Sequence, residues 1–233
     1  MAIGIHRYGN GKSDVYVKHG DSRVVFAYPP IGPDDSMVIG KTVLMTNGLR
    51  LPTGLETARL IYEAYCGEHY DLPEFEAVRK FLEKSKLPLF NNNFVTSKGL
   101  VVMDDSDCVS FNRRFDERTL EGKLVGARNV EGVLFGEGIR FIPRNSEYAG
   151  NFDEASGFSG WGVAVASVDV EGYELLQEVA SRLGTHFECD YIGSDEPEST
   201  TSALSIKNYV LELVHFARDS ELDERNYVFP VRK

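Results

Sequence analysis

Two helix signals lie close together in residues 53–82, TGLETARLIYEAYCGEHYDLPEFEAVRKFL, and this stretch decides the fold class. Thr53 and Glu56 have the spacing of a capping box, in which a hydroxyl and a carboxylate each bind a free backbone amide at the start of a helix. The apolar residues that follow recur at helical spacing, namely Leu55, Ala58, Ile61, Tyr62 and Tyr65. We therefore predict a capped helix that begins at Thr53.

The second half of the stretch predicts another helix, which begins near Asp71-Leu-Pro-Glu74. Aspartate is a favoured residue just before a helix, and proline is tolerated in its first turn. The apolar residues of this helix fall on one side, namely Phe75, Val78, Phe81 and Leu82. We therefore predict a second capped helix that is amphipathic.

Strands are predicted on both sides of these helices. In the first fifty residues, short apolar or alternating runs are separated by Gly9-Asn-Gly11 and Gly20-Asp-Ser22, which is typical of hairpins. The apolar run 37–46 is interpreted as part of this β-structure. Further elements are expected as strands at 87–94, 99–103 and 108–111, a short helix at 116–125 and a hairpin at 132–142. This pattern predicts a mostly antiparallel or mixed sheet with two capped helices.

The last third of the chain predicts a different arrangement. Residues 162–168 form an apolar run, residues 171–183 have an amphipathic helical pattern, and a strand is expected at 186–192. This order predicts a βαβ-like unit. A late amphipathic helix is expected at 202–218.

Residues 144–160 are rich in Gly, Asn and Ser and are predicted to be a loop or linker. They separate an N-terminal α+β part, residues 1–143, from a smaller α/β part, residues 161–233. The two parts can equally form one compact domain. The predicted fold class is α+β.

The composition is that of a globular protein, with 42% hydrophobic and 26% charged residues among 233. We find no apolar core of signal-peptide length and no run of about 18 apolar residues, so neither secretion nor a membrane span is expected. Three scattered cysteines are typical of a reducing compartment, and we predict a cytoplasmic protein. No cluster of Lys and Arg stands out in a chain of net charge −11, so nucleic acid is not an expected partner.

The negative charge is confined to one segment. Residues 145–198 contain twelve acidic residues and a single basic one, Arg182, so they account for the whole net charge of −11. In the helix predicted there, Glu171, Glu174 and Glu178 fall on one side at spacings of three and four. Such a surface either keeps the protein soluble or binds a basic protein. The favoured functional hypothesis is a non-catalytic binding protein with this acidic surface, and its oligomeric state stays open.

A second hypothesis is a metal-dependent enzyme centred on Asp104, Asp105 and Asp107. These acids follow the apolar run 100–103, and carboxylates at the end of a strand can hold Mg²⁺ or Mn²⁺ for a transferase or hydrolase reaction. The alternative is a polar turn between two paired strands, which Asp clusters often form. No cofactor is predicted, and only a divalent cation is left open.

A third hypothesis is a structural zinc site made of Cys66, His69, His186 and Cys189. Two thiolates and two imidazoles are the ligands of a closed tetrahedral site. Residues three apart on a strand point to opposite faces, however, which favours separate roles for His186 and Cys189.

The stretch Gly9-Asn-Gly-Lys-Ser13 contains the residue types of a phosphate-binding loop. The loop requires a glycine five residues before Gly11, where this chain has His6, and a helix after the lysine. Residues 14–18 alternate with period two and predict a strand instead. We therefore predict a hairpin turn at this position.

Overall fold

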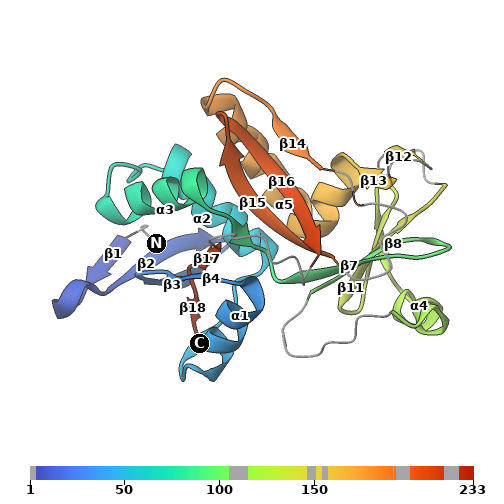
Figure 1. Cartoon of the computed structure of the whole chain (residues 1–233), viewed down its shortest axis with the longest axis horizontal. Helices are drawn as coiled ribbons and strands as arrows, with labels where there is room; N and C mark the ends of the chain where they lie inside the picture. The colour runs from blue at the N-terminus through green and yellow to red at the C-terminus, as the bar shows by residue number, and fades with distance from the viewer. Residues whose placement is uncertain are drawn as a thin grey trace.

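The structure is a computed structural model that describes residues 4–104, 115–145, 151–153, 157–190, 192, 200–217 and 226–233. It confirms the predicted α+β class, because helices pack against antiparallel and mixed sheets (Figure 1). Among the helices of these described ranges, none is long and apolar enough to cross a membrane.

The first sheet combines strands from both ends of the chain. The strands β1 (Gly4–Arg7), β2 (Ser13–His19) and β3 (Ser22–Tyr28) form the predicted antiparallel hairpins. The last strand, β18 (Val231–Arg232), pairs between β3 and β5 (Leu49–Arg50). Figure 1 accordingly shows the C-terminus beside the first strands.

The two helices of residues 53–82 cover one face of this sheet. The helix α2 (Gly54–Cys66) begins with the predicted capping box, in which Thr53 Oγ1 accepts from the Glu56 amide at 3.2 Å and Glu56 Oε2 accepts from the Thr53 amide at 2.8 Å. The helix α3 (Pro73–Lys84) is also confirmed. The capping role predicted for Asp71 is wrong, because the residue before this helix is Leu72, which makes no side-chain cap, and the proline at the first helical position starts the helix.

The apolar run 37–46 is a helix and not part of the β-structure. This helix, α1 (Ser36–Met45), begins after Asp35, whose carboxylate accepts from the Met37 amide at 2.7 Å. Its residues Ile39 and Val43 share an apolar cluster with Ala27 and Leu49 of the first sheet. A short apolar run does not distinguish a buried helix from a strand, and the aspartate cap decides in favour of the helix.

The second sheet is larger and mixed. Among the described strands of this sheet, the edge strand β14 pairs in parallel with β16, and the other pairings are antiparallel. In spatial order its strands are β14 (Phe187–Cys189), β16 (Val210–Ala217), β15 (Thr200–Lys207), β7 (Asn91–Val95), β8 (Gly99–Asp104), β11 (Ile139–Pro143), β10 (Val133–Gly136) and β9 (Arg128–Val130).

The smaller elements complete the architecture. The remaining strand pairs are β6 (Leu87–Pro88) with β15, β4 (Ile31–Asp34) with β17 (Asn226–Val228), and β12 (Asn151–Asp153) with β13 (Gly157–Ser159). Single turns of helix are η1 (Gly9–Gly11), η2 (Glu117–Thr119) and α4 (Leu120–Lys123), of which the last two confirm the short helix expected at 116–125. The strand expected at 108–111 lies outside the described residues.

The predicted βαβ-like unit is wrong in its first strand. Residues 162–168 belong to the long helix α5 (Trp161–Arg182), which changes direction at Asp169, where φ is 71°. The first seven residues after Trp161 are buried on all sides of the helix, which removes the polar positions that reveal a helical period. A fully buried helix therefore produces the same apolar run as a buried strand.

The late helix expected at 202–218 is also wrong, because residues 202–217 belong to the hairpin of β15 and β16. Asn208 and Tyr209 form its two-residue turn, with φ of 51° and 67°. Positive φ at both central residues is the geometry of the tight hairpin turn whose twist matches that of the strands.

The core connects the two parts that the sequence separates. The helix α2 packs against α5, and one hydrophobic cluster contains Val15 and Leu60 together with Leu176 and Leu213. The division of the chain at 144–160 stays a prediction. Within that segment, residues 151–153 and 157–159 pair as β12 and β13.

Candidate functional site

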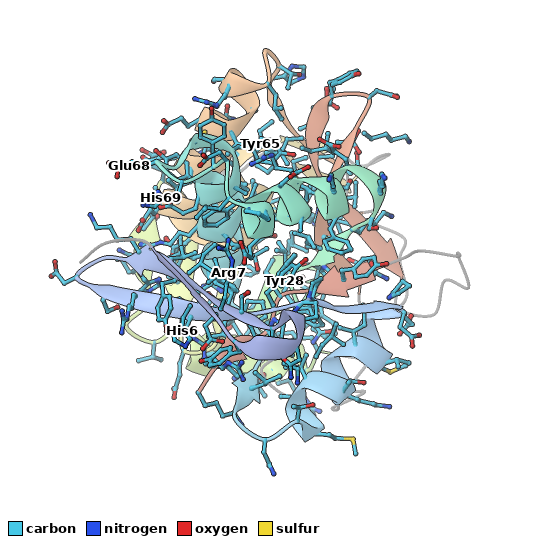
Figure 2. The ribbon with its side chains drawn as sticks, turned by 90° about the vertical axis from the view of Figure 1, so that its left-hand side faces the viewer. His6, Arg7, Tyr28, Tyr65, Glu68 and His69 are labelled. Carbon is cyan, nitrogen blue, oxygen red and sulfur yellow. The ribbon has the colours of Figure 1, made fainter. Side chains whose placement is uncertain are left out.

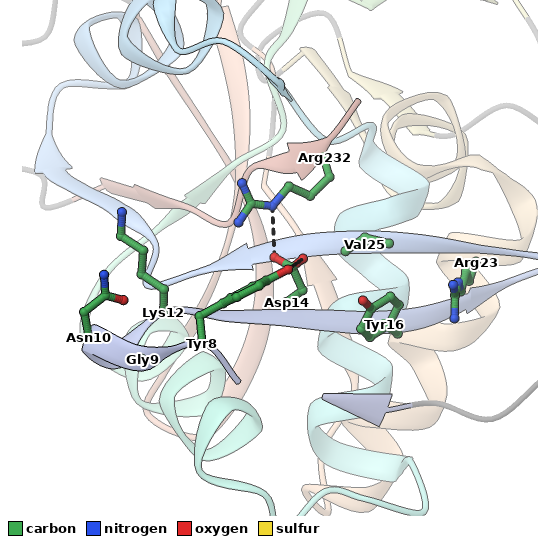
Figure 3. A pocket seen from close by; sticks show the side chains of 9 residues that line it. All are labelled: Tyr8, Gly9, Asn10, Lys12, Asp14, Tyr16, Arg23, Val25 and Arg232. Atoms are coloured by element: carbon green, nitrogen blue, oxygen red, sulfur yellow. Dashed lines mark hydrogen bonds and ion pairs between the residues drawn. The ribbon is translucent and has the colours of Figure 1, made fainter. Parts of the chain in front are cut away.

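The face of the first sheet that carries α1 continues into a shallow depression with a volume of about 1120 Å³ (Figure 3). Alternation along β2 produces this face, because Val15 and Val17 point into the core while Asp14 and Tyr16 point away from it. The side chains that line the depression come from the turn after β1, from β2, from β3 and from β18, and include Tyr8, Lys12, Asp14, Tyr16, Arg23 and Arg232.

Asp14 organises one end of the depression. Tyr8 donates its hydroxyl to Asp14 Oδ2 at 2.7 Å, and Arg232 Nε donates to Asp14 Oδ1 at 2.9 Å. The Asp14 side chain is only 9% exposed, whereas Arg232 is 40% exposed. The hydrogen bond to Asp14 raises the pKa of Tyr8, so its hydroxyl stays a donor. The carboxylate is thus satisfied from within the protein, and both partners remain accessible.

The charge of the depression is positive in an acidic protein. Lys12, Arg23 and Arg232 line the depression together with a single carboxylate, Asp14. The Arg23 guanidinium lies over the Tyr16 ring at 4.6 Å from its centroid, and neither Lys12 nor Arg23 forms an ion pair with a described residue. These two cations are therefore available to a negatively charged ligand.

The strands that carry the depression are anchored from behind. Arg7 lies between β1 and α3 and binds Glu74 through two hydrogen bonds of 2.9 and 3.0 Å, and Ser13 donates to the same carboxylate at 3.1 Å (Figure 2). The hydrogen bonds from Arg7 hold the pKa of Glu74 below its usual value, so the carboxylate stays ionised at neutral pH. This contact fixes β1 and β2 against α3 and with them the position of Tyr8 and Asp14.

The sequence contains only a partial signal for this site. The turn Gly9-Asn-Gly11 is the hairpin turn that we predict, yet its neighbour Lys12 lines the depression. We expect no cluster of Lys and Arg from the sequence, because the three that line the depression are not neighbours there, but the fold brings them to one surface. Arg232 reaches the site because β18 pairs with β3 at the far end of the chain.

The acidic residues predicted on one helix side are exposed on α5, but they are not equivalent. Glu174 is exposed and forms no hydrogen bond or ion pair with a described side chain, and Glu178 accepts a long hydrogen bond of 3.4 Å from the Tyr62 hydroxyl. Glu171 forms an ion pair of 2.5 Å with Arg59, whose side chain is only 9% exposed. One of the three carboxylates therefore has a structural partner.

The structure does not bring the four predicted zinc ligands together. Cys66 and His69 lie at the end of α2 and in the segment after it (Figure 2), and His186 Nε2 lies 2.7 Å from Glu188. Cys189 has another imidazole as its neighbour, that of His215. Within the described part of the chain, no three His, Cys, Asp or Glu residues are arranged to hold a metal ion.

The predicted aspartate site falls largely outside the described residues. Asp104 is the last residue of β8, where its backbone pairs with Asn91. The side chain of Asp104 and the whole of Asp105 and Asp107 lie outside the part of the chain that the structure describes. The hypothesis of a Mg²⁺ or Mn²⁺ enzyme therefore stays a prediction.

Comparison of the chain with protein-family models, with curated proteins and with solved structures finds no match. The chemistry of the residues described above is therefore the basis for a function.

Proposed function

We propose that this protein is a binding protein, and that its depression on the first sheet binds an anionic small molecule with a planar ring. The observation that carries the proposal is the excess of cations: Lys12, Arg23 and Arg232 line the depression with one carboxylate, and that carboxylate already has two internal donors. An anion in this position gains charge-assisted hydrogen bonds without displacing an internal ion pair.

Arg232 is suited to contact the anionic group directly. Its Nε is used by Asp14, which fixes the plane of the guanidinium and leaves the two Nη groups for a ligand. A planar fork of donors matches the oxygen geometry of a phosphate or a carboxylate. Figure 3 shows Lys12 on the same side of Asp14 as the Tyr8 ring, and its ammonium adds a second, mobile positive charge.

The two tyrosines supply the surface for a planar ring. Tyr8 is 46% exposed and is held in place by its hydrogen bond to Asp14 and by edge-to-face contact with His6 at a centroid distance of 4.7 Å. The Tyr16 ring is flanked by the Arg23 guanidinium. Aromatic and guanidinium planes on an open sheet face favour stacking of a ring.

Calorimetric titration tests this function with three probes: adenosine 5′-monophosphate, adenosine and inorganic phosphate, each at low ionic strength. We expect the monophosphate to bind more tightly than either part alone, and binding to weaken with salt. The variant Lys12→Gln removes a cation without breaking an internal pair, and it should weaken monophosphate binding by about fivefold to tenfold.

Arg118→Gln is the control, because Arg118 is 91% exposed, pairs with its near neighbour Asp116 and lies beside α4, at the opposite end of the molecule from β1 in Figure 1. This variant should bind as the wild type does. Equal binding by wild type and Lys12→Gln, or binding of none of the three probes, would contradict the proposal.

The acidic surface of α5 remains a separate hypothesis for a basic protein partner. Glu174 and Glu178 are its exposed members that form no ion pair with a described residue, and many of the other acids of residues 145–198 lie outside the described ranges. Replacement of these two residues by Gln should abolish salt-sensitive binding of a basic protein if the surface serves that purpose.

A further inference from the structure

A row of polar side chains crosses four neighbouring strands of the second sheet. It consists of Cys189 on β14, His215 on β16, Ser202 on β15 and Asn93 on β7, in the spatial order of the strands. The register places Ser202 opposite His215, and Cys189 opposite Leu213, two residues before His215 on the same face. The row therefore brings a thiol, an imidazole, a hydroxyl and an amide into one line.

The imidazole is held at one nitrogen and faces the thiol with the other. His215 Nδ1 lies 3.0 Å from Ser202 Oγ and 3.4 Å from Asn93 Nδ2, which itself donates to Ser202 Oγ at 3.0 Å. His215 Nε2 lies 3.9 Å from the Cys189 sulfur. When Nδ1 donates its proton to Ser202, Nε2 is one of two acceptors within reach of the thiol, and the other is the Asp190 carbonyl oxygen at 3.6 Å.

Two further observations set this row apart from ordinary packing. Asn93 is 1% exposed, and its Oδ1 has no hydrogen-bond partner among the described residues, although a buried unpaired oxygen is destabilising. The Gly160 amide donates to the Cys189 sulfur, and Gly160 precedes α5, whose first turn has no side-chain cap. The thiol therefore lies at the uncapped start of α5, where the Gly160 amide reaches it.

We infer that Cys189 is a nucleophilic thiol, that His215 is its base, and that Ser202 and Asn93 position the imidazole. The substrate class is a compound with an electrophilic carbonyl carbon, such as an ester or thioester. The three roles of nucleophile, base and orienting group are present at hydrogen-bonding distances that commonly shorten when substrate binds.

The reaction balances with the groups present. The sulfur forms a bond to the carbonyl carbon while the thiol proton passes to His215 Nε2, and the carbonyl electron pair moves to oxygen, where the free amides at the start of α5 can bind it. As the carbonyl re-forms, the bond to the leaving group breaks, and the leaving group takes the proton from Nε2. Water then takes the acyl group from sulfur and restores the thiol.

Before any reaction, the Cys189 thiol and the His215 imidazole are both uncharged. Burial raises the pKa of the Cys189 thiol to about 12, with the Gly160 amide acting in the opposite direction, and burial lowers the pKa of His215 to about 3. Among the described residues, the Asp190 carboxylate also raises the pKa of the thiol, whereas the cluster formed by β13, α5 and Ile192 around Cys189 is apolar. Neither group changes protonation between pH 6 and 9, so a reaction assisted by His215 should have a rate independent of pH.

Alkylation by iodoacetamide, followed site by site by mass spectrometry between pH 6 and 9, tests the pair. Its S–C bond forms as iodide leaves, and the proton passes to His215. We expect Cys189 to be labelled at a nearly constant rate, whereas the rate at Cys66, which has no neighbouring base of this kind, should rise about tenfold per pH unit below its pKa. His215→Gln should lower the Cys189 rate at pH 7 by about a hundredfold. His186→Gln, three residues before Cys189 and exposed, is the control and should change nothing.

The acyl step is measured with p-nitrophenyl acetate, which should leave an acetyl group on Cys189 in the wild type and not in His215→Gln. An unlabelled Cys189 in the folded wild type, or the same rate and pH profile in both proteins, overturns the inference. If thermal melting shows that His215→Gln is unfolded, Ser202→Ala decides instead. A Cys189 rate about tenfold lower in that variant supports the positioning role, and an unchanged rate refutes it.

Discussion

Arg232 and Asp14 are 218 positions apart in the sequence, yet the Arg232 Nε donates to Asp14 Oδ1 at 2.9 Å. The strand β3 lies between their strands, so the arginine side chain spans it. The same carboxylate also accepts from Tyr8, which joins the turn after β1 to the end of the chain. This contact both closes the first sheet and shapes the depression beside it.

Removal of the Asp14 carboxylate should therefore destabilise the fold. Asp14→Ala leaves the Tyr8 hydroxyl and the Arg232 guanidinium without their shared acceptor, and we expect a loss of about 1–2 kcal/mol in the free energy of unfolding. Urea denaturation at pH 7 measures it. Asp21→Ala, in the exposed turn between β2 and β3, is the control and should change stability little. A loss of equal size in the two variants would contradict the role of Asp14.

The candidate site shows what a single sequence can and cannot reveal. The alternation of residues 14–18 predicts a strand, and that strand carries Asp14 and Tyr16. The pairing of β18 with β3 depends on long-range packing that no local pattern encodes, so Arg232 could not be assigned to the same surface. The row of Cys189, His215, Ser202 and Asn93 was inaccessible for the same reason, since 122 positions separate Asn93 from His215.

The capping box of α2 should give stability that depends on pH. Burial opposes ionisation of Glu56, but hydrogen bonds from Arg50 and from the Thr53 amide outweigh it and hold the pKa of Glu56 below its usual value. A lowered folded-state pKa contributes stability above the unfolded pKa of about 4.3, and this contribution is lost as pH falls through the folded pKa.

Glu56→Gln should therefore lower the free energy of unfolding by about 1–2 kcal/mol at pH 7, and the difference from wild type should shrink as pH falls below about 4. Urea denaturation at a series of pH values measures both effects. The same substitution at Glu83, an exposed residue of α3, is the control. A difference between wild type and Glu56→Gln that persists unchanged to low pH would show that the charge is not the cause.

The turn between β15 and β16 predicts a stabilising substitution. Tyr209 has a φ of 67° and is 82% exposed, so its side chain has a strained backbone and little burial to compensate. Tyr209→Gly should raise the free energy of unfolding by about 0.5–1 kcal/mol, and Tyr209→Val should lower it. The melting temperatures of the wild type and the two variants test this order. If this segment were helical, the glycine variant would instead have the lowest melting temperature.

The same turn explains the largest error of the sequence-based prediction. Ile206, Val210, Leu213, Val214 and Ala217 happen to recur at helical spacing, and Asn208-Tyr209 lacks the glycine that commonly marks a tight turn. By contrast, the capping box at Thr53 and the glycine-containing turns of the first sheet are local chemical signals, and the elements that they predict are confirmed. Local caps and turns could thus be predicted from the sequence, whereas the start of α5 could not, because it is buried on all sides and has no helical period of polar residues.

Close packing of α2 on α5 should make Gly54 intolerant of a side chain. A Cβ built there would lie 2.1 Å from the Ser167 carbonyl oxygen, which belongs to the backbone of α5. Gly54→Ala should lower the free energy of unfolding by about 1–3 kcal/mol. Gly122→Ala is the matched control, because Gly122 lies in α4 with no atom within 4 Å of such a Cβ, and alanine there should be neutral or stabilising. Chemical denaturation that finds the two variants alike would contradict this packing.

The ion pair between Arg59 and Glu171 distinguishes a carboxylate of α5 that stabilises the fold from carboxylates that only add surface charge. Arg59 is almost fully buried, donates to the Lys18 carbonyl and to Glu171, and has no other acceptor among the described residues, so Glu171→Gln leaves its charge poorly compensated. We expect this variant to lose about 1–3 kcal/mol of stability, and Glu174→Gln, on the same helix and exposed, to change it by less than about 0.5 kcal/mol. Equal stability of the two variants in urea would show that Glu171 is only a surface charge. This difference decides which variant tests the acidic-surface hypothesis. A variant that includes Glu171→Gln can lose partner binding because the protein unfolds. The double variant Glu174→Gln, Glu178→Gln changes the surface charge and leaves Arg59 paired.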